Sequence, residues 1–524
     1  MSSLLKQNSE VKRIITILAG LSLLSSAAMA QDATIRIHDA GNGETIPAEI
    51  YGQFSEHLGR CIYGGLWVGK DSSVPNIEGY RKDVFEALKT LKVPVMRWPG
   101  GCFADEYHWM DGIGPQEQRP KIANNGWGGA PTEDNSFGTH EFLNLCEMLG
   151  IEPYISGNMG SGSVEEMAKW VEYMTAPAGS TVADMRVANG RKEPWKVKYF
   201  GVGNEAWGCG GSMSPEHYSD LYRRYATYLR NQPGNSLIKV GSGASDYDYN
   251  WTEVLMDKIG GQMQALSLHY YTMFWGTSGI AYDFDDKGYY KFLSKTLDID
   301  NVLQKHISIM DKYDPNGRIA LYLDEWGTWY DVTPDTGPSH ICQQSTMRDA
   351  IVAALNFDIF HKYTRRLKMC NIAQVVNVLQ SMILTNENDM VLTPTYHIFE
   401  MYNVHQDADY LPTDVSTSLV KGTFRGVPVP EVDATASRKD GKIHFDLVNT
   451  SLKSAKTVLV EFDDAKAVGK VRSARILTAS KAQDFNDFDH KDTVAPKAFK
   501  DYKVTKNGIE VTLPPCSVVA FEAE

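Results

Sequence analysis

Residues 197–208 read VKYFGVGNEAWG, and this stretch predicts a buried strand that ends on an acid. Its first half is mostly apolar, aromatic or glycine, as in the core strands of a parallel sheet. The strand stops on Asn204 and Glu205, beside Trp207 and a glycine-rich turn. A second stretch, IALYLDEWGTW at 319–329, has the same form and runs into Glu325. The two stretches together predict two carboxylates at the ends of two buried strands.

Short apolar stretches of this kind recur along the chain and alternate with amphipathic helical patterns, such as 82–91 and 215–231. The alternation predicts a (β/α)₈ TIM barrel. An open, doubly wound sheet is the alternative, but its first strand would be followed by a glycine-rich phosphate turn, which FSEHLGR is not. The eight expected strands are 49–54, 94–98, 153–156, 197–202, 238–241, 265–269, 319–323 and 374–379.

Beyond residue 402 the pattern changes to alternating strands with polar turns, as in KIHFDLVN at 442–449. This predicts a C-terminal antiparallel β-sandwich. The alternating stretch 33–46 has no place in the barrel, so we expect it to join the sandwich. The expected division is a signal peptide at 1–30, an N-terminal strand at 31–47, the catalytic barrel at 48–402 and the β-sandwich at 403–524.

The first thirty residues have the pattern of a secretory signal peptide. Lys6, Lys12 and Arg13 precede an apolar run at 14–24, and small residues end at 28–30. The run is shorter than the roughly 20 residues that span a bilayer, so no stable membrane insertion is expected after cleavage. The pattern predicts an exported protein, either periplasmic or secreted.

Charge and cysteine usage limit the kinds of partner, metal and cofactor that we expect. The formal net charge is −13, and no cluster of Lys and Arg interrupts it, so no nucleic-acid partner is expected. The 7 cysteines are widely spaced and form neither a zinc pattern nor a disulfide framework. One or two bridges are compatible with this spacing, free thiols are expected for most, and no metal or cofactor is expected.

Polar or aromatic residues follow seven of the eight expected strands, where TIM barrels carry their chemistry. Glu205 and Glu325, on strands four and seven, face one another across the barrel mouth. Such carboxylates can approach to about 5 Å, the separation in a retaining glycoside hydrolase. Like charges this close do not both ionise easily, so one carboxyl is expected to stay protonated. Structural ion pairs are the alternative, but no cation adjoins either glutamate in sequence.

Six stretches between residues 51 and 380 resemble the α-L-arabinofuranosidases of glycoside hydrolase family 51. They are YGQFSEHLGRCIYGGLW, MRWPGGCFADEYHW, KYFGVGNEAWGCGG, LSLHYY, LYLDEWGTWY and NIAQVVNVLQ. The resemblance implies release of terminal α-L-arabinofuranosyl residues from arabinan, arabinoxylan or their oligosaccharides by double displacement. It also leaves a homo-oligomer open, since members of the family often form hexamers.

The resemblance implies roles for individual residues. Glu205 resembles the general acid/base, and Glu325 resembles the nucleophile. Asn204 matches the residue that binds the sugar 2-hydroxyl. Glu56 matches a sugar-binding glutamate after strand one, and Gln374 matches a contact to a sugar hydroxyl.

At three further positions the match to the family leaves a choice or shows a difference. Tyr271 matches the tyrosine that orients the nucleophile, although Tyr270 is an equally close choice of register. Cys102 stands where the family's substrate-binding asparagine is expected, and because a thiol is a weak hydrogen-bond partner, fine specificity is expected to differ there. Trp98 either contacts the substrate or packs in the core.

Two other functions fit the same pattern. Another retaining barrel glycosidase, such as an endoglucanase or xylosidase, would share the acid pair but have a different site shape. A non-catalytic carbohydrate-binding protein could use the same scaffold, but it would have no need of both Glu205 and Glu325.

Overall fold

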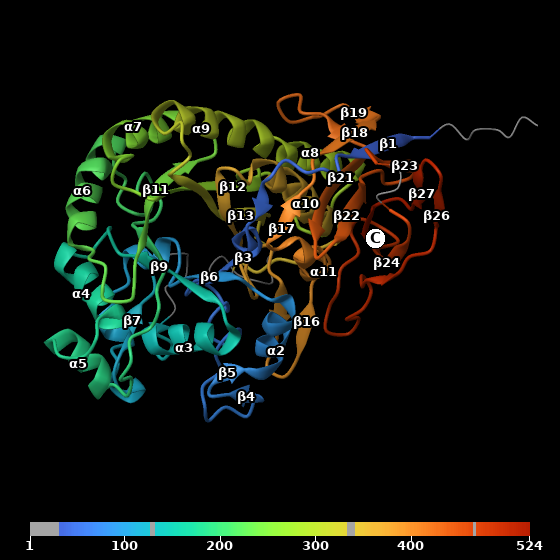
Figure 1. Ribbon diagram of the computed structural model, residues 1–524. Helices are drawn as coiled ribbons and strands as arrows, with labels where there is room; N and C mark the ends of the chain where they lie inside the picture. Colours follow the sequence, from blue (N-terminus) through green and yellow to red (C-terminus); the bar gives the residue numbers. More distant parts are fainter. Residues whose placement is uncertain (1–30, 126–131, 333–340, 465–467) are drawn as a thin grey trace, which may run out of the picture.

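The computed structural model describes residues 31–125, 132–332, 341–464 and 468–524. Within these ranges the chain forms a barrel followed by two packed β-sheets. In Figure 1 the barrel lies on the left and both sheets lie on the right. The expected signal peptide at 1–30 lies outside the described residues. The predicted fold class is confirmed, whereas the expected boundary between residues 402 and 403 stays a prediction.

The barrel consists of eight parallel strands that close in the order β10-β11-β12-β13-β14-β3-β6-β9. Nearly all of their side chains are buried, because helices cover the outside and side chains fill the inside. The strands are β3 (Gly52–Phe54), β6 (Val95–Trp98), β9 (Glu152–Gly157), β10 (Tyr199–Val202), β11 (Ile238–Ser245), β12 (Ala265–Met273), β13 (Ala320–Trp329) and β14 (Leu367–Ala373).

Several of the helices that surround the barrel begin at a capping residue, as α6 does. Ser214 accepts a hydrogen bond from the backbone N–H of His217 at 3.2 Å, and Pro215 occupies the first helical position of α6. The helices are α2 (Lys82–Leu91), α3 (Thr139–Leu149), α4 (Val164–Thr175), α5 (Thr181–Ala188), α6 (Pro215–Tyr228), α7 (Tyr249–Ile259), α8 (Asp286–Leu297), α9 (Ile299–Tyr313), α10 (Met347–Phe360) and α11 (Pro394–Tyr402).

The eighth strand was expected at 374–379, and this prediction is wrong, because β14 precedes that segment. The valines at 375, 376 and 378 favour a strand in the sequence, whereas Lys368 and Asn371 interrupt the apolar pattern of β14. Asn377 and Leu379 have φ values of 62° and 51°, which an extended strand does not contain. The first strand is also shorter than expected, because Ala48–Tyr51 forms a 3₁₀ turn before β3.

The sandwich consists of two sheets with strand orders β18-β1-β23-β27-β26 and β2-β17-β21-β22-β28-β24-β25. As expected, the N-terminal strand joins it: β1 pairs with β18 and with β23, in the blue-to-red juxtaposition of Figure 1. The β1–β23 pair is parallel, an exception to the antiparallel pattern that we expected.

The strands of the sandwich are β1 (Ala33–Ile37), β2 (Thr45–Ile46), β17 (Ala408–Tyr410), β18 (Thr413–Thr417), β21 (Val432–Lys439), β22 (Lys442–Asn449), β23 (Lys456–Phe462), β24 (Val471–Thr478), β25 (Lys497–Ala498), β26 (Tyr502–Thr505), β27 (Gly508–Leu513) and β28 (Ser517–Ala523). Short ribbons in the loops pair β4 (Asn76–Ile77) with β5 (Tyr80–Arg81), β7 (Ile122–Ala123) with β8 (Thr132–Glu133), β15 (Ile383–Thr385) with β16 (Met390–Leu392), and β19 (Leu419–Val420) with β20 (Val429–Pro430).

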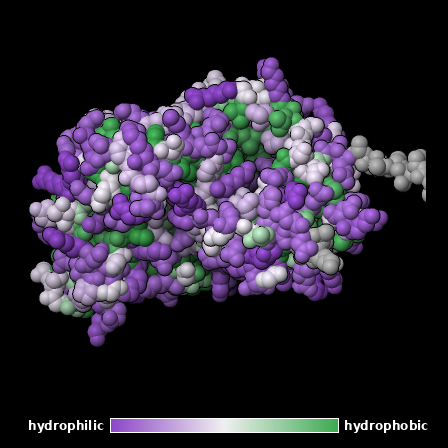
Figure 2. Space-filling view, turned by 45° about the horizontal axis from the view of Figure 1, so that its top comes forward, coloured by the Kyte–Doolittle hydropathy of each residue, from purple (hydrophilic) through white to green (hydrophobic). Residues whose placement is uncertain are grey.

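The two parts of the molecule share a buried boundary. All residues of α10 are buried, because this helix packs against β13 of the barrel and against β21, β22 and β28 of the sandwich. The outer face in Figure 2 is mostly hydrophilic, with apolar residues in separate patches. Among the described residues, no helix is long and apolar enough to cross a membrane.

Candidate active site

Glu205 and Glu325 meet at the mouth of the barrel. Glu205 follows β10, and Glu325 lies in the second half of β13. One carboxylate oxygen of each, together with a ring nitrogen of His269, lies within 4.8 Å of the others. They open onto a pocket lined by Phe54, Glu56, Leu58, Gly101, Cys102, Glu205, Tyr271, Glu325, Trp329, Gln374 and Leu379.

Two donors hold the carboxylate of Glu325. Arg97, on β6, donates from Nη1 to Oε1 at 2.8 Å, and the Tyr271 hydroxyl donates to Oε2 at 2.8 Å. Two hydrogen bonds of this kind, one to each carboxylate oxygen, fix the orientation of the Glu325 side chain. A Cβ at Gly101 would lie 2.8 Å from the same Oε1, so glycine lets the loop after β6 pass close to the carboxylate.

Glu205 has a different environment from Glu325. Its Oε1 lies 2.7 Å from Nδ1 of His269, and arginine does not hydrogen-bond to its carboxylate among the described residues. Burial raises the pKa of Glu205 above its usual value, and the charge of Glu325 adds to the rise, against the opposing His269 hydrogen bond. The backbone of Glu205 has a φ of 35°, a left-handed conformation that is uncommon for a residue with a side chain. Glu205 is therefore the carboxyl better suited to carry a proton.

His269 connects the acids. The register of β12 and β13 places it opposite Glu325, with Nδ1 3.5 Å from Oε2 of that residue, and its Nε2 lies 3.1 Å from Oδ1 of Asp324. Burial alone would lower the pKa of His269, but the neighbouring carboxylates raise it to about 10. Burial likewise opposes ionisation of Asp324, yet Arg97 and His269 hold its pKa below the usual value. Two cations thus face three carboxylates, an excess that favours one bound proton.

Glu56 and Gln374 also line the pocket and hydrogen-bond to each other. Oε1 of Glu56 accepts from the backbone N–H groups of Gly101 at 2.9 Å and Phe103 at 3.1 Å, and Oε2 accepts from Nε2 of Gln374 at 2.8 Å. Burial raises the pKa of Glu56 to about 7, and the charge of Glu325 adds to this. Oε1 of Gln374 is buried and has no hydrogen-bond partner in the described part of the chain. Such an acceptor is available to a sugar hydroxyl.

Most residues expected at the site come together there. Asn204 accepts at Oδ1 from Nη2 of Arg97 at 2.6 Å, which fixes its amide beside both glutamates. Tyr271 and not Tyr270 hydrogen-bonds to Glu325, because the Tyr270 hydroxyl is buried elsewhere and donates to the carbonyl of Lys295.

Trp98 does not line the pocket, and its expected contact with the substrate is wrong. Its side chain is fully buried and stacks on Phe142 with a centroid distance of 4.9 Å. Its indole N–H is already engaged, because it donates to Nε2 of His57 at 3.1 Å. The alternative of core packing is the one that the structure has.

Cys102 lines the pocket but has no free thiol. It forms a disulfide with Cys209, which lies in the glycine-rich turn after Glu205. The expectation of a weakly hydrogen-bonding thiol at this position is therefore corrected to a bridged sulfur. The other described cysteines are free, as expected for most: Cys61, Cys146, Cys342, Cys370 and Cys516.

Sequence reasoning gave no role to Arg97, His269, Asp324 or Tyr154. Tyr154 donates from its hydroxyl to Oδ2 of Asp324 at 2.7 Å, deep in the barrel. One signal was present: Arg97 lies within an apolar strand, and a buried arginine requires acidic partners. These partners lie far away in sequence, so the absence of an adjacent cation does not exclude an ion pair to Glu325.

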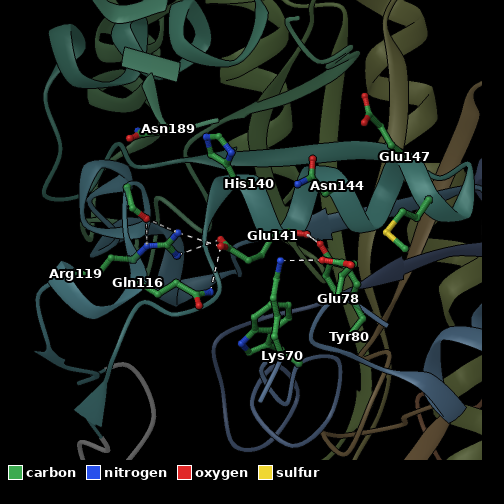
Figure 3. Close-up of a pocket in the computed structure, with 13 residues that line it drawn as sticks. Lys70, Glu78, Tyr80, Gln116, Arg119, His140, Glu141, Asn144, Glu147 and Asn189 are labelled. Carbon is green, nitrogen blue, oxygen red and sulfur yellow. Dashed lines mark hydrogen bonds and ion pairs between the residues drawn. The ribbon is translucent and has the colours of Figure 1, made fainter. Parts of the chain in front are cut away.

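A larger pocket lies elsewhere on the barrel, but it is a weaker candidate for an active site. It lies beside α3, and Figure 3 shows two ion pairs among the charged residues that line it. Arg119 pairs with Glu141 at 3.0 Å, and Lys70 pairs with Glu78 at 2.8 Å. Because these charges are already paired, the barrel mouth remains the candidate active site.

Comparisons with known proteins show the family to which the chain belongs. The family model "Alpha-L-arabinofuranosidase 1 domain" matches residues 87–286, and "Alpha-L-arabinofuranosidase C-terminal domain" matches residues 324–517. The chain is 58% identical to the "Intracellular exo-alpha-L-arabinofuranosidase" of Bacteroides ovatus, over 98% of this chain and 99% of that one. The chain belongs to the α-L-arabinofuranosidases of glycoside hydrolase family 51.

Two other relatives support this membership. The crystal structure of the GH51 arabinofuranosidase from Xanthomonas axonopodis pv. citri has a TM-score of 0.91 and 45% identity, covering 94% of this chain and 100% of that one. A "Probable alpha-L-arabinofuranosidase C" of Aspergillus niger is 33% identical over 80% of this chain and 85% of its own length. The enzyme is thus an α-L-arabinofuranosidase, a glycoside hydrolase with an arabinose-containing glycan as substrate, and neither a non-catalytic binding protein nor a member of another glycosidase family.

The expected export is wrong. The Bacteroides ovatus relative matches nearly the whole chain and is named an intracellular enzyme, which contradicts a periplasmic or secreted location. The signal-like pattern of the first thirty residues finds no support in this comparison. A short apolar run after a few cations is a weak pattern, since it records composition and not cleavage.

Proposed function

We propose that this arabinofuranosidase removes terminal non-reducing α-L-arabinofuranosyl residues by double displacement, with Glu205 as general acid/base and Glu325 as nucleophile. One observation carries the proposal: the two carboxyls lie within reach of one sugar but have opposite environments. Glu325 accepts from Arg97 at 2.8 Å and from Tyr271 at 2.8 Å, whereas burial raises the pKa of Glu205. One carboxyl is thus prepared to attack and the other to give a proton.

The reaction follows from this division. In the first step Glu205 donates its proton to the glycosidic oxygen while Glu325 attacks the anomeric carbon and forms a glycosyl-enzyme. In the second step Glu205 takes a proton from water, which displaces Glu325 from the sugar. Two inversions retain the configuration at the anomeric carbon. The proximity of the carboxylates, within 4.8 Å, leaves little room for the water of a single inverting step.

We infer that Glu56, Asn204 and Gln374 recognise the arabinofuranosyl ring. The carboxylate of Glu56 accepts hydrogen bonds from sugar hydroxyls, and Oε1 of Gln374, which lacks a protein partner in the described residues, accepts another. Asn204, fixed by Arg97, addresses the 2-hydroxyl beside the reacting carbon. Arabinan, arabinoxylan and their oligosaccharides carry such terminal units.

The test uses two substrates that differ in leaving group. Glu325→Ala is expected to abolish turnover of both an aryl α-L-arabinofuranoside and an arabino-oligosaccharide. Glu205→Ala is expected to affect the oligosaccharide most, because a good aryl leaving group needs no proton. Proton NMR of the first product should show retained configuration. Wild-type rates on the oligosaccharide with either variant, or an inverted product, would overturn the assignment.

A further inference from the structure

The disulfide between Cys102 and Cys209 has no part in the mechanism above, yet it ties the turn that carries Glu205 to the neighbouring loop after β6. Cys102 lies in the loop after β6, and Cys209 lies in the turn after β10, 107 positions further along the chain. Cys209 is exposed and Cys102 is half-buried. An exposed sulfur is open to attack by a thiolate, so this bridge is accessible to thiol–disulfide exchange.

Both sulfur atoms lie against the acid/base. The Sγ of Cys209 is 3.6 Å from Oε2 of Glu205, and the Sγ of Cys102 is 3.9 Å from the same oxygen. The other oxygen, Oε1, is held by His269 at 2.7 Å. The disulfide therefore contacts the Oε2 side of the Glu205 carboxyl group and limits its movement in that direction.

The turn that the bridge anchors is tightly folded. Glu205 has a φ of 35°, a conformation that persists only where the surroundings hold it. Its carbonyl accepts from the backbone N–H of Gly208 at 2.7 Å, and a Cβ at Gly210 would lie 1.8 Å from the carbonyl oxygen of Asn204. A covalent tie at Cys209 fixes the far end of this turn to the neighbouring loop.

We propose that the Cys102–Cys209 bridge positions Glu205 for proton transfer, and that its reduction by a small dithiol slows the acid-catalysed step. The proposal rests on the proposed role of Glu205. In the exchange the dithiol loses two electrons and two protons and becomes a disulfide, the bond between Cys102 and Cys209 breaks, and two thiols form. Released from its tie, the turn no longer holds Glu205, and two ionisable thiols replace an uncharged wall beside its Oε2.

The experiment compares the oxidised enzyme with the enzyme reduced by dithiothreitol, on the two substrates used above. Reduction is expected to lower kcat/KM about ten-fold on the arabino-oligosaccharide, because that leaving group needs the proton, and far less on the 4-nitrophenyl arabinofuranoside. The basic limb of the pH profile on the oligosaccharide is expected to move. Alkylation of the denatured protein with iodoacetamide, followed by mass spectrometry, should count five thiols before reduction and seven after it.

Variants separate positioning from general damage. Cys102→Ser, Cys209→Ser and the double variant are expected to behave like the reduced enzyme and not to respond to dithiothreitol. Cys342→Ser is the matched control, because this partly exposed thiol is free, and the variant should keep both the activity and the response. Melting temperatures of the reduced enzyme and of the double variant that both lie well above the assay temperature show that unfolding is not the cause of the lower rate.

Two results would overturn the inference: seven thiols in the enzyme before reduction, or equal rates and pH profiles in both redox states on both substrates. Failure of the proposed function is a different result. If Glu205→Gln shows no dependence on the leaving group, the role of Glu205 itself is wrong. If Glu205→Gln shows that dependence and dithiothreitol changes nothing, the function stands and the inference alone fails.

Discussion

The hydroxyl group of Tyr271 gives a prediction about the proposed nucleophile, Glu325. Tyr271→Phe removes the donor 2.8 Å from Oε2 of Glu325, and a hydrogen bond to a charged group contributes about 1.5–3 kcal/mol. We expect kcat/KM to fall about 10- to 100-fold on the aryl and the natural substrate alike, because the nucleophile serves both. Tyr270→Phe is the matched control, since its hydroxyl donates to a backbone carbonyl outside the pocket. Steady-state kinetics on both substrates test this prediction. An equal loss of kcat/KM in the two variants would contradict the assignment of Tyr271, and not Tyr270, as the partner of Glu325.

Glu56 makes a prediction about stability and pH. Burial raises its pKa from 4.5 to about 7, so between these values the folded protein holds a proton that the unfolded chain has lost. Its contribution to the free energy of unfolding is complete below pH 4.5 and declines as the pH rises to 7, by about 3 kcal/mol. Glu56→Gln should remove this decline, since Gln374 can turn its unpartnered Oε1 toward the new amide.

Urea denaturation of both proteins at pH 5 and pH 8 tests this prediction. The wild type should lose more stability between the two pH values than Glu56→Gln does. Every other titrating group is shared, so the difference between the two losses isolates Glu56. Parallel losses in the two proteins would mean that Glu56 is ionised throughout this range.

Among the elements, the helices and most barrel strands could be predicted because their local patterns and tertiary roles agree. The segment 82–91 was expected as a helix and is α2 at Lys82–Leu91. β14 could not be predicted, because Lys368 and Asn371 interrupt its apolar pattern, and the more regular run that follows it is a turn. Glu205 and Glu325 could be predicted as site residues because each follows an apolar stretch of sequence. Arg97 and His269 could not, because their acidic partners are distant in sequence and come close only in the closed barrel.

The loop after β6 gives a prediction at the scale of elements. Gly101→Ala places a Cβ 2.8 Å from Oε1 of Glu325, so either the loop or the carboxylate must move. Catalysis should suffer more than folding: a displacement of about 1 Å can cost 100-fold in kcat. Gly261→Ala is the control, because no atom lies within 4 Å of its added Cβ. Kinetics and thermal unfolding of both variants test this, and an active Gly101→Ala enzyme would show that the loop yields without disturbing the nucleophile.

For the whole molecule, the shared boundary predicts that barrel and sandwich unfold together. α10 is buried between them, and His361 lies 2.9 Å from the Tyr51 hydroxyl of the barrel and 2.8 Å from the Thr435 hydroxyl of the sandwich. All 11 tryptophans precede residue 403, so tryptophan fluorescence reports on the barrel, whereas far-ultraviolet circular dichroism reports on both parts. The two probes should therefore give one coincident transition in urea.

A substitution in β1, which belongs to the sandwich, tests whether the sandwich and the barrel unfold together. Ile35 is fully buried in the sandwich, and Ile35→Ala should cost about 2–5 kcal/mol of stability. If the parts are coupled, the fluorescence transition of the distant tryptophans moves to lower urea by the same amount as the circular dichroism transition. Arg36→Ala, at the exposed neighbouring position, should leave both transitions nearly unchanged, because an exposed ion pair adds little stability. A fluorescence midpoint that stays in place while the circular dichroism becomes biphasic would show that the sandwich unfolds separately, and that the N-terminal strand stabilises the sandwich alone.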